Sequence, residues 1–205
     1  EVAILALWLA EHQMNLEFKA AFGNAPASLP LKDGAKIKCG NALQVDWQKV
    51  CPKEEGHEVF VMGNPPYLGA RQQGAAQKAD IRHVARHIQG HGNLDYISGF
   101  LICGAGYVQE TGAETAFVCT NSVGQGEQVA LLWPHILTEE VEIGFACQSF
   151  KWTNSAKANA AVMCVIIGLR RPSLRPKYLY SAGIQRRVSH ISPYLVEGKT
   201  VYVVP

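Results

Sequence analysis

Residues 58–67 read EVFVMGNPPY, the most informative stretch of the chain. Its first five residues are a run of mostly β-branched and aromatic side chains that stops at Gly63, a pattern typical of a buried parallel strand. Asn64-Pro65-Pro66-Tyr67 follows at the carboxyl end of that strand, where open α/β sheets place their ligand sites. The stretch therefore predicts an α/β fold with a functional loop after this strand.

The loop at residues 64–67 has a specific chemical character. Two prolines fix φ and remove backbone donors, so the loop is rigid and presents carbonyl oxygens. The Asn64 side chain adds an acceptor, and Tyr67 adds a flat ring beside it. Such acceptors beside a stacking ring suit a planar group that carries an NH₂. The same four residues also suit an ordinary rigid turn after a strand.

The rest of the chain alternates predicted strands and helices, which indicates an α/β fold with a largely parallel sheet. The last two strands are close in sequence and predict an antiparallel, hairpin-like pair. We expect Asn93 to cap the helix at 95–108. The predicted strands are 35–39, 58–62, 115–120, 141–150 and 160–169; the predicted helices are 1–22, 76–89, 95–108 and one from the turn at 124–126 to residue 137.

The predicted helix at 1–22 begins with residues that are apolar on all sides, including Trp8. A helix of this kind has to be covered from several sides. We therefore expect Trp8 to lie in a core, as we do for Trp133. We also expect that the chain starts in the middle of a domain.

Charge is unevenly distributed along the chain. Apolar residues make up 48% and charged residues 18%, which excludes intrinsic disorder. The formal charge of +2 argues by itself against a nucleic-acid partner. Residues 170–205, however, hold seven Lys and Arg and one acid, a charge of +6, whereas residues 1–169 carry −4. This basic tail is expected either to contact a DNA backbone or to act only as a solubilising surface.

The six cysteines form no CxxC motif, and four of them lie in apolar runs. They predict free, buried thiols in a reducing compartment rather than a disulfide framework. The longest apolar stretch, residues 2–10, is too short to cross a bilayer and follows no basic segment. The sequence therefore predicts a cytoplasmic protein without a membrane partner.

Asn64-Pro65-Pro66-Tyr67 matches the (D/N/S)-P-P-(Y/F/W) signature of S-adenosylmethionine-dependent amino-methyltransferases, which methylate exocyclic amines of bases or glutamine amides. With its neighbouring segments it resembles the MmeI-like (type IIL) group of adenine-N6 DNA methyltransferases, in which modification and restriction share one polypeptide. The segments are GNAL (40–43), GNPPYLG (63–69), NLDYISGF (93–100), FVCTNSVGQGEQV (117–129), FKWTN (150–154), NAAVMCVIIGL (159–169) and SPYLVEG (192–198).

The resemblance implies a Rossmann-like class I methyltransferase sheet that is only partly present. The family's strand order is 3-2-1-4-5-7-6, and strands 1 and 2, with the main loop for S-adenosylmethionine, are expected upstream of residue 1. Residues 1–170 would then be the C-terminal portion of the catalytic domain, and residues 171–205 a basic segment that leads into a target-recognition region. We expect little or no cofactor affinity and no activity from the chain alone.

The resemblance also implies roles for individual residues, with double-stranded DNA as the partner. The target adenine would rotate out of the duplex, stack on Tyr67 and be closed over by Phe150 or Trp152. Asn64 and the Pro65 carbonyl would accept hydrogen bonds from its N6 amine, in a loop that Pro66 stiffens. The implied cofactor-binding residues are Asn41, Ala42 and Asn64, and no metal is implied.

Other interpretations stay open at this point. His83, His87 and His91 are four residues apart and suit a basic helix face along DNA better than a metal site. Trp47 either caps the sheet or borders the cofactor. The chain as a whole is alternatively a non-catalytic DNA-binding or scaffold remnant, a glutamine-amide methyltransferase or an RNA-base methyltransferase.

Overall fold

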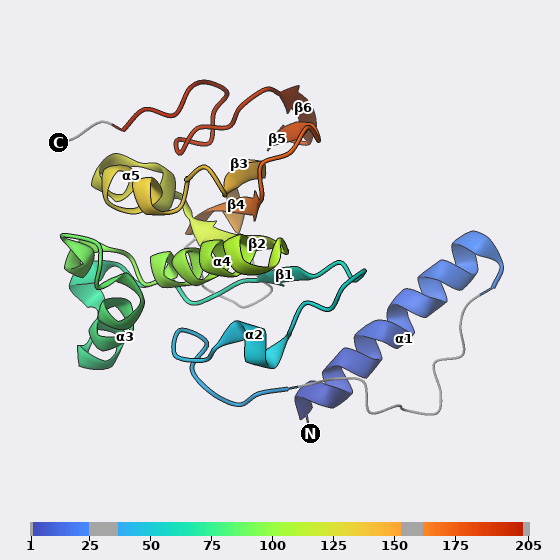
Figure 1. The fold of residues 1–205 in the computed structure, drawn as a ribbon. Coiled ribbons are helices and arrows are strands. Elements are labelled where there is room, and N and C mark those ends of the chain that lie inside the picture. Colours follow the sequence, from blue (N-terminus) through green and yellow to red (C-terminus); the bar gives the residue numbers. More distant parts are fainter. Residues whose placement is uncertain (1, 25–36, 153–161, 203–205) are drawn as a thin grey trace.

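The computed structural model describes residues 2–24, 37–152 and 162–202, and a six-stranded sheet forms its centre (Figure 1). The sheet order is β1-β2-β4-β3-β5-β6. The part of this order that runs β1-β2-β4-β3 matches the 4-5-7-6 portion expected from the resemblance. The strands are β1 (Phe60–Gly63), β2 (Glu114–Thr120), β3 (Glu142–Trp152), β4 (Val162–Arg170), β5 (Lys177–Ser181) and β6 (Ile184–Val188).

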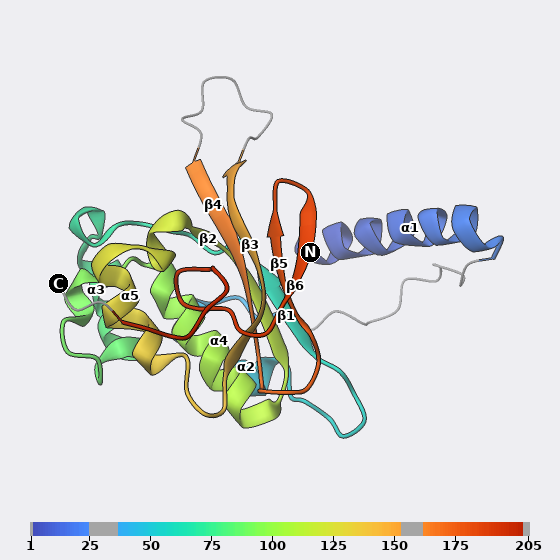
Figure 2. The ribbon, with the colours of Figure 1, turned by 90° about the horizontal axis from the view of Figure 1, so that it is seen from above.

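Helices α3, α4 and α5 lie on one side of the sheet, whereas α1 projects away on the other side (Figure 2). Helix α4 packs on β2 and β4 through buried residues such as Leu101 and Val108. Within the described residues, no helix is both long and apolar enough to span a membrane. The helices are α1 (Val2–Phe22), α2 (Trp47–Val50), α3 (Ala75–Ala85), α4 (Ile97–Thr111) and α5 (Gly126–Leu132), with 3₁₀ turns η1 (Ala70–Gln72), η2 (His91–Asn93), η3 (Asn121–Gly124) and η4 (Trp133–His135).

The sheet is mixed, so the prediction of a largely parallel sheet is wrong. β1 and β2 are parallel, as expected for strands joined through a helix, and β3 and β5 are parallel as well. β4, however, runs antiparallel to both of its neighbours, β2 and β3. The antiparallel pairing of β3 with β4 confirms the predicted hairpin-like finish. A strand that returns by a short connection must reverse direction, and this is why the sheet cannot be uniform.

Strand β1 is an edge strand rather than a buried one. It pairs with β2, and its Phe60 and Met62 are 57% and 76% exposed. The predicted strand at 35–39 is not found on its other side: residues 37–39 form no strand, and residues 35 and 36 lie outside the described residues. The apolar side chains of β1 thus predicted a covered strand, but no strand within the described chain pairs with its free edge.

Helix α1 forms as predicted, but the expectation that it is buried is wrong. None of its residues is buried, and Trp8 is only half-covered. Trp133, by contrast, is fully buried, as expected. The described part of the chain does not cover the apolar side chains of α1, because the helix stands apart from the sheet (Figure 1).

Strands β5 and β6 are absent from the predicted elements, because the residues beyond 170 stand out in the sequence only by their charge. Ala182 and Gly183 join the two strands, with φ of 48° and 79°. Two successive positive φ values are typical of the tight turn that fits the twist of a hairpin. β5 pairs with β3, so the sheet continues across the expected boundary at residue 170.

Two helix ends and the cysteines also differ from the predictions. Helix α3 ends at Ala85, four residues early, and Asn93 lies in η2 rather than capping α4. Tyr96 is the N-cap residue of α4 and makes no capping hydrogen bond with its side chain, whereas Asp95, just before it, accepts a hydrogen bond from the Ile97 amide at 3.2 Å through its Oδ1. All six cysteines are free, as predicted, but Cys39 and Cys51 are exposed and not buried.

Candidate active site

The loop at residues 64–67 leaves the carboxyl end of β1, as predicted. Its side chains differ in exposure: Asn64 and Pro66 are exposed, Pro65 is buried and Tyr67 is half-buried. Because Gly63 is in register with Phe117 of the parallel strand β2, the loop lies beside the carboxyl end of β2 as well. The acceptor side chain of Asn64 therefore faces solvent at the end of the sheet where ligand sites are found.

Tyr67 reaches the start of β4, where its hydroxyl contacts the thiol of Cys164. Burial, and then the neighbouring thiol, raises the pKa of Tyr67, so its ring is neutral at physiological pH. Cys164 is in register with Phe150 of β3, and residues directly opposite in an antiparallel pair have side chains on the same face. The structure thus brings Tyr67 and Phe150, two predicted base-stacking residues, to the same end of the sheet.

Trp152, the other stacking candidate, is the next residue of β3 on the same face as Phe150. The centroids of the two rings are 6.2 Å apart, and the indole is 37% exposed. Residues 153–161, which include the rest of the FKWTN segment, lie outside the described residues. The structure therefore leaves both rings as candidates for one wall of the site.

The segment after β2 closes the same end of the sheet. The Asn121 Oδ1 accepts a hydrogen bond from the Ser149 hydroxyl of β3 at 2.7 Å, and the Thr120 and Ser122 hydroxyls are 2.8 Å apart. These contacts fix η3 against the strand that carries Phe150. Three segments quoted for the family resemblance, GNPPYLG, TNSVGQG and FKW, therefore converge in space.

Leu68 fixes the loop to the body of the protein through its backbone. Its amide donates to Asp95 Oδ1 at 3.1 Å, and its carbonyl accepts from the Tyr96 amide at 3.0 Å and from Gln73 Nε2 at 2.9 Å. Gln73 is buried and also donates to the Leu94 carbonyl at 2.9 Å. The position of Tyr67 thus depends on contacts with both the start of α4 and the segment before α3.

Asn41 belongs to a hydrogen-bond network around the buried Asp80 that the sequence did not reveal. Its Nδ2 donates to Asp80 Oδ2 at 2.8 Å, and its Oδ1 accepts from the Leu43 amide at 3.0 Å. The Tyr96 hydroxyl donates to the same carboxylate at 2.8 Å and Gln44 Nε2 at 2.6 Å. Asp80 therefore links the GNAL segment to the start of α4 and, through Tyr96, to the loop at residues 64–67.

The protonation states suit this network. Burial opposes ionisation of Asp80, but hydrogen bonds from Gln44, Tyr96 and Asn41 outweigh it and lower the pKa of the carboxyl. Burial and the hydrogen bond to Asp80 raise the pKa of Tyr96 to about 12. One feature of the sequence could have indicated the role of Asp80 in this network: it is the single acid between residues 59 and 94, in the middle of a predicted helix.

The GNAL segment also packs on the helical side of the sheet through Trp47. The indole nitrogen donates to the Ala42 carbonyl at 2.8 Å, and the ring lies 6.1 Å from that of Tyr107 and 6.2 Å from that of Phe117. This arrangement corresponds to the sheet-capping interpretation of Trp47. Ala42 itself is exposed, as is Asn41.

The three histidines do not share one helix face as predicted, because α3 ends before His87 and His91. His91 instead contacts the Ile88 carbonyl at 3.0 Å, and the ring of His87 lies 5.5 Å from that of His135. Burial and the nearby His87 lower the pKa of His135. In the part of the chain that the structure describes, no three His, Cys, Asp or Glu residues are grouped as metal ligands.

Comparison with known proteins agrees with this arrangement. A family model described as "MmeI, DNA-methyltransferase domain" matches residues 1–181. This chain belongs to the MmeI DNA-methyltransferase family. Family membership confirms the resemblance noted in the sequence, and the mixed α/β sheet is the partial methyltransferase sheet that we expected.

Two relatives illustrate the family. "DNA methyltransferase A" of Bacillus subtilis (strain 168) is 45% identical over 205 residues, which are 99% of this chain and 23% of that protein. The structure of the type IIL restriction–modification enzyme MmeI in complex with DNA matches with a TM-score of 0.81 and 39% identity, over 96% of this chain and 27% of that one. The chain thus spans about a quarter of the length of these two proteins.

Proposed function

We propose that this chain carries the target-base side of an adenine-N6 DNA methyltransferase, which acts on double-stranded DNA in the cytoplasm as part of a restriction–modification protein. The observation that carries the proposal is the convergence of Asn64, Tyr67 and Phe150 at the carboxyl end of β1 and β2. The related MmeI structure is a complex with DNA, which supports the choice of partner. Residues 1–170 would supply the chemistry, and residues 171–205 would lead toward target recognition.

On the base side, the proposed substrate is an adenine rotated out of the duplex. Tyr67 stacks on one face of the base, and Phe150 or Trp152 covers the other. The raised pKa of Tyr67 keeps this ring uncharged. Stacking is tolerant of base identity, so selection of a base that carries an exocyclic amine falls to the acceptors of the loop.

The loop at residues 64–67 positions the nucleophile. The Asn64 side-chain oxygen and the Pro65 carbonyl accept hydrogen bonds from the N6 amine, which draws its lone pair out of the ring system. Pro66 keeps the two acceptors rigid. Catalysis of this kind works through positioning and electrostatics, and it requires no general base with a shifted pKa.

S-adenosylmethionine supplies the electrophilic methyl group when it is bound. The residues here fit part of that molecule: Asn41 is exposed, and its Oδ1 accepts one hydrogen bond although a carbonyl oxygen has two lone pairs. An adenine-ring NH₂ is a suitable second donor, with Ala42 beside it and Asn64 on the side of the target base. We expect the main cofactor loop to precede Glu1 and the chain alone to bind weakly, which isothermal titration with S-adenosylmethionine tests.

The names of the relatives favour DNA over the RNA-base and glutamine-amide alternatives, because one is a DNA methyltransferase and the other is a restriction–modification enzyme in complex with DNA. The alternative of a non-catalytic remnant predicts that the protein containing this chain, at its full length, transfers no methyl group. A transfer assay with labelled S-adenosylmethionine on duplex DNA, single-stranded RNA and a glutamine peptide separates these classes.

Substitution of Asn64 tests the mechanism. We expect Asn64→Ala in the full-length protein to lower kcat for adenine methylation by about 10²- to 10³-fold, the typical loss for one positioned hydrogen-bonding group. Asn93→Ala, the same change at another exposed asparagine, is the matched control. Activity that survives Asn64→Ala refutes the mechanism, and methylation of cytosine rather than adenine refutes the proposed substrate.

A further inference from the structure

Two groups of Lys and Arg side chains in this chain have different surroundings. The first group begins the basic tail and is already engaged within the protein. Arg170 and Lys177 each lie 2.9 Å from a Glu142 carboxylate oxygen. Arg175 lies 2.6 Å from Glu114, and Arg171 donates to the Gln109 carbonyl. The charge of +6 counted along the sequence thus overstates what this tail offers to a partner.

The second group, which we call the α3 stripe, consists of Arg71, Lys78, Arg82 and Arg86, all of them exposed. The last three are spaced four residues apart along α3 and its C-cap, so they lie on one face of the helix. Within the described residues no ion pair is found for any of the four. Asp80 on the same helix is buried, and its carboxylate accepts hydrogen bonds from Asn41 and Gln44 rather than pairing with these cations.

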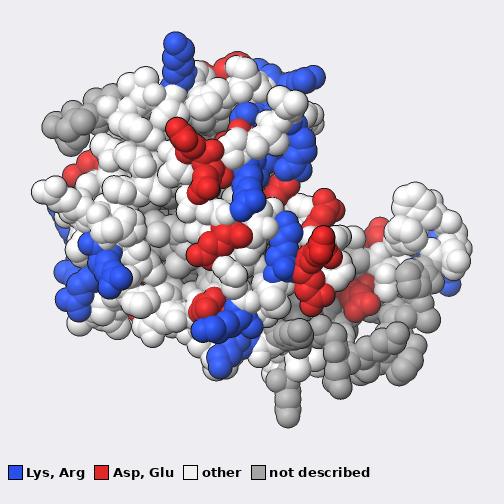
Figure 3. Space-filling view, in the orientation of Figure 1, with Lys and Arg blue, Asp and Glu red and all other residues white. Residues whose placement is uncertain are grey.

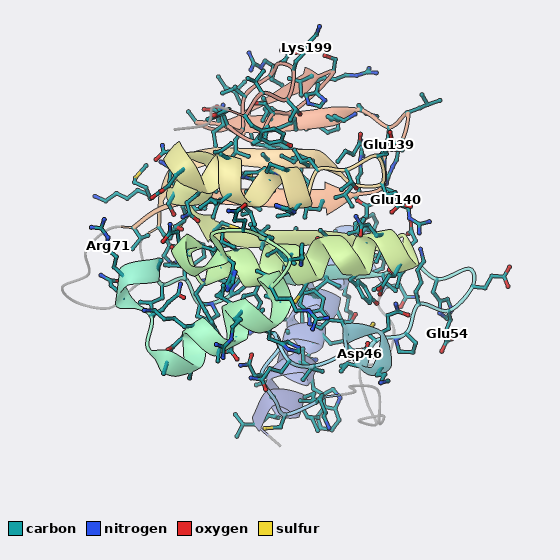
Figure 4. All side chains as sticks on the ribbon, turned by 60° about the vertical axis from the view of Figure 1, so that its left-hand side comes forward. Asp46, Glu54, Arg71, Glu139, Glu140 and Lys199 are labelled. Carbon is teal, nitrogen blue, oxygen red and sulfur yellow. The ribbon has the colours of Figure 1, made fainter. Side chains whose placement is uncertain are left out.

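The surface views agree with this separation. Lys and Arg side chains gather over α3 with few acids beside them, whereas toward the middle and the opposite side both signs of charge are interspersed (Figure 3). Arg71 points outward at the end of the molecule where α4 begins, whereas Asp46, Glu54, Glu139 and Glu140 lie toward the other end (Figure 4). Arg71 thus lies at the end of the molecule that holds the candidate active site, away from these four acids.

The inner side of α3 is fixed to the candidate active site. Asp80 binds Tyr96, whose amide donates to the Leu68 carbonyl directly after the loop at residues 64–67. Gln73, just before α3, donates to the same carbonyl at 2.9 Å. The outer, basic face of α3 is thus held at a set position relative to Tyr67.

We propose that the α3 stripe binds the phosphate backbone of the DNA beside the rotated adenine, an inference that rests on the proposed function. Phosphate contacts fix the register of a protein on DNA without reading its sequence. Cations that form no ion pair within the described residues suit that task, whereas cations held by Glu142 and Glu114 do not. The stripe therefore positions the target base, and sequence recognition lies elsewhere.

The salt dependence of DNA binding tests the proposal. Each phosphate contact contributes about 0.9 to the slope of log K against log salt concentration. We expect Arg82→Gln with Arg86→Gln in the full-length protein to reduce that slope by about 2 on duplexes with and without the recognition sequence. Fluorescence anisotropy in a potassium chloride series measures it. Lys78→Gln, a single change, should reduce the slope by about 1, and this variant replaces the double variant in the test if the latter does not fold.

The matched control is Arg186→Gln with Arg187→Gln, which removes the same charge from exposed positions of β6. We expect this variant to keep the wild-type slope. An unchanged slope in the α3 variants overturns the proposal, and so does an equal reduction in the β6 variant, since the effect would then be one of net charge. If the wild-type protein methylates no adenine, the proposed function fails; if it does and the α3 variants keep their slope, this inference alone fails.

Discussion

Asn41 and Asp80 are joined by a hydrogen bond of 2.8 Å from Nδ2 to Oδ2. An ionised carboxylate can only accept, so this contact fixes which way the Asn41 amide points. Oδ1 is thereby turned toward the Leu43 amide, with one lone pair left for another donor. The orientation of a proposed cofactor-binding side chain is thus set by a residue 39 positions further along the chain.

Asp80→Asn should therefore lower the free energy of unfolding by about 1–3 kcal/mol, because the new NH₂ cannot accept the hydrogen bonds that the carboxylate oxygen accepts now. The pKa of Asp80 is lowered in the folded state, so its stabilisation is complete above the ordinary carboxyl pKa of about 3.9 and is lost as the pH falls through the folded value. Urea unfolding at pH 7 and at pH 3 measures this. A difference between variant and wild type that does not shrink at pH 3 contradicts it, and Glu54→Gln is the exposed control.

Removal of the Phe150 ring tests the proposed stacking wall. Phe150→Ala in the full-length protein should lower kcat/KM for DNA methylation about tenfold or more, because base–aromatic stacking contributes about 1–3 kcal/mol. The fluorescence of 2-aminopurine at the target position rises when the base leaves the stack of the duplex. This fluorescence should be lower in the variant, because fewer bases are rotated out. If Trp152→Ala gives the larger loss, Trp152 and not Phe150 closes the site.

Gly104 and Gly106 lie on one helix but differ in what a methyl group would meet. A Cβ at Gly104 would lie 2.8 Å from the Phe117 ring, whereas at Gly106 nothing lies within 4 Å. Gly104→Ala should lower the free energy of unfolding by about 1–3 kcal/mol through overpacking. Gly106→Ala should raise it by up to about 1 kcal/mol, because alanine is the better helix former. Thermal unfolding of the two variants compares them, and equal shifts would show that α4 does not pack on β2 as described.

Where the sequence predicted the fold, the signal was local. Composition alone indicates a strand in the run ending at Gly63, in the apolar segment of β2, and in the closely spaced β3 and β4. The two prolines at 65 and 66 predict the rigid loop at residues 64–67. The predictions about burial failed at β1 and α1 for a different reason. An apolar pattern indicates that a surface is buried in the complete fold, but it does not indicate which part of a longer protein packs on it.

The Asp80 network and the β5–β6 hairpin were missed because they depend on distant pairing. Nothing near Asp80 in the sequence indicates that it binds Asn41, 39 residues earlier. In the tail, the prediction rested on the positive charge, and the Ala182-Gly183 turn was not recognised. The same charge count suggested a DNA-binding tail. Glu142, which pairs with two of those cations, lies 28 residues before Arg170 and became its partner only through the register of β3 and β4.

Glu142 should accordingly matter for stability rather than for DNA binding. Its carboxylate bridges Arg170 and Lys177, whose side chains are only 8% and 14% exposed. Glu142→Gln leaves two largely buried cations without a counter-charge and should lower the free energy of unfolding by about 3 kcal/mol. Glu114→Gln breaks the more exposed pair with Arg175 and should cost about 1 kcal/mol or less. Urea unfolding distinguishes the two, and about 0.5 M salt should weaken the Glu114 effect more, because exposed pairs are screened more strongly. Equal losses in both variants would mean that the Glu142 cluster is no more buried than the surface pair.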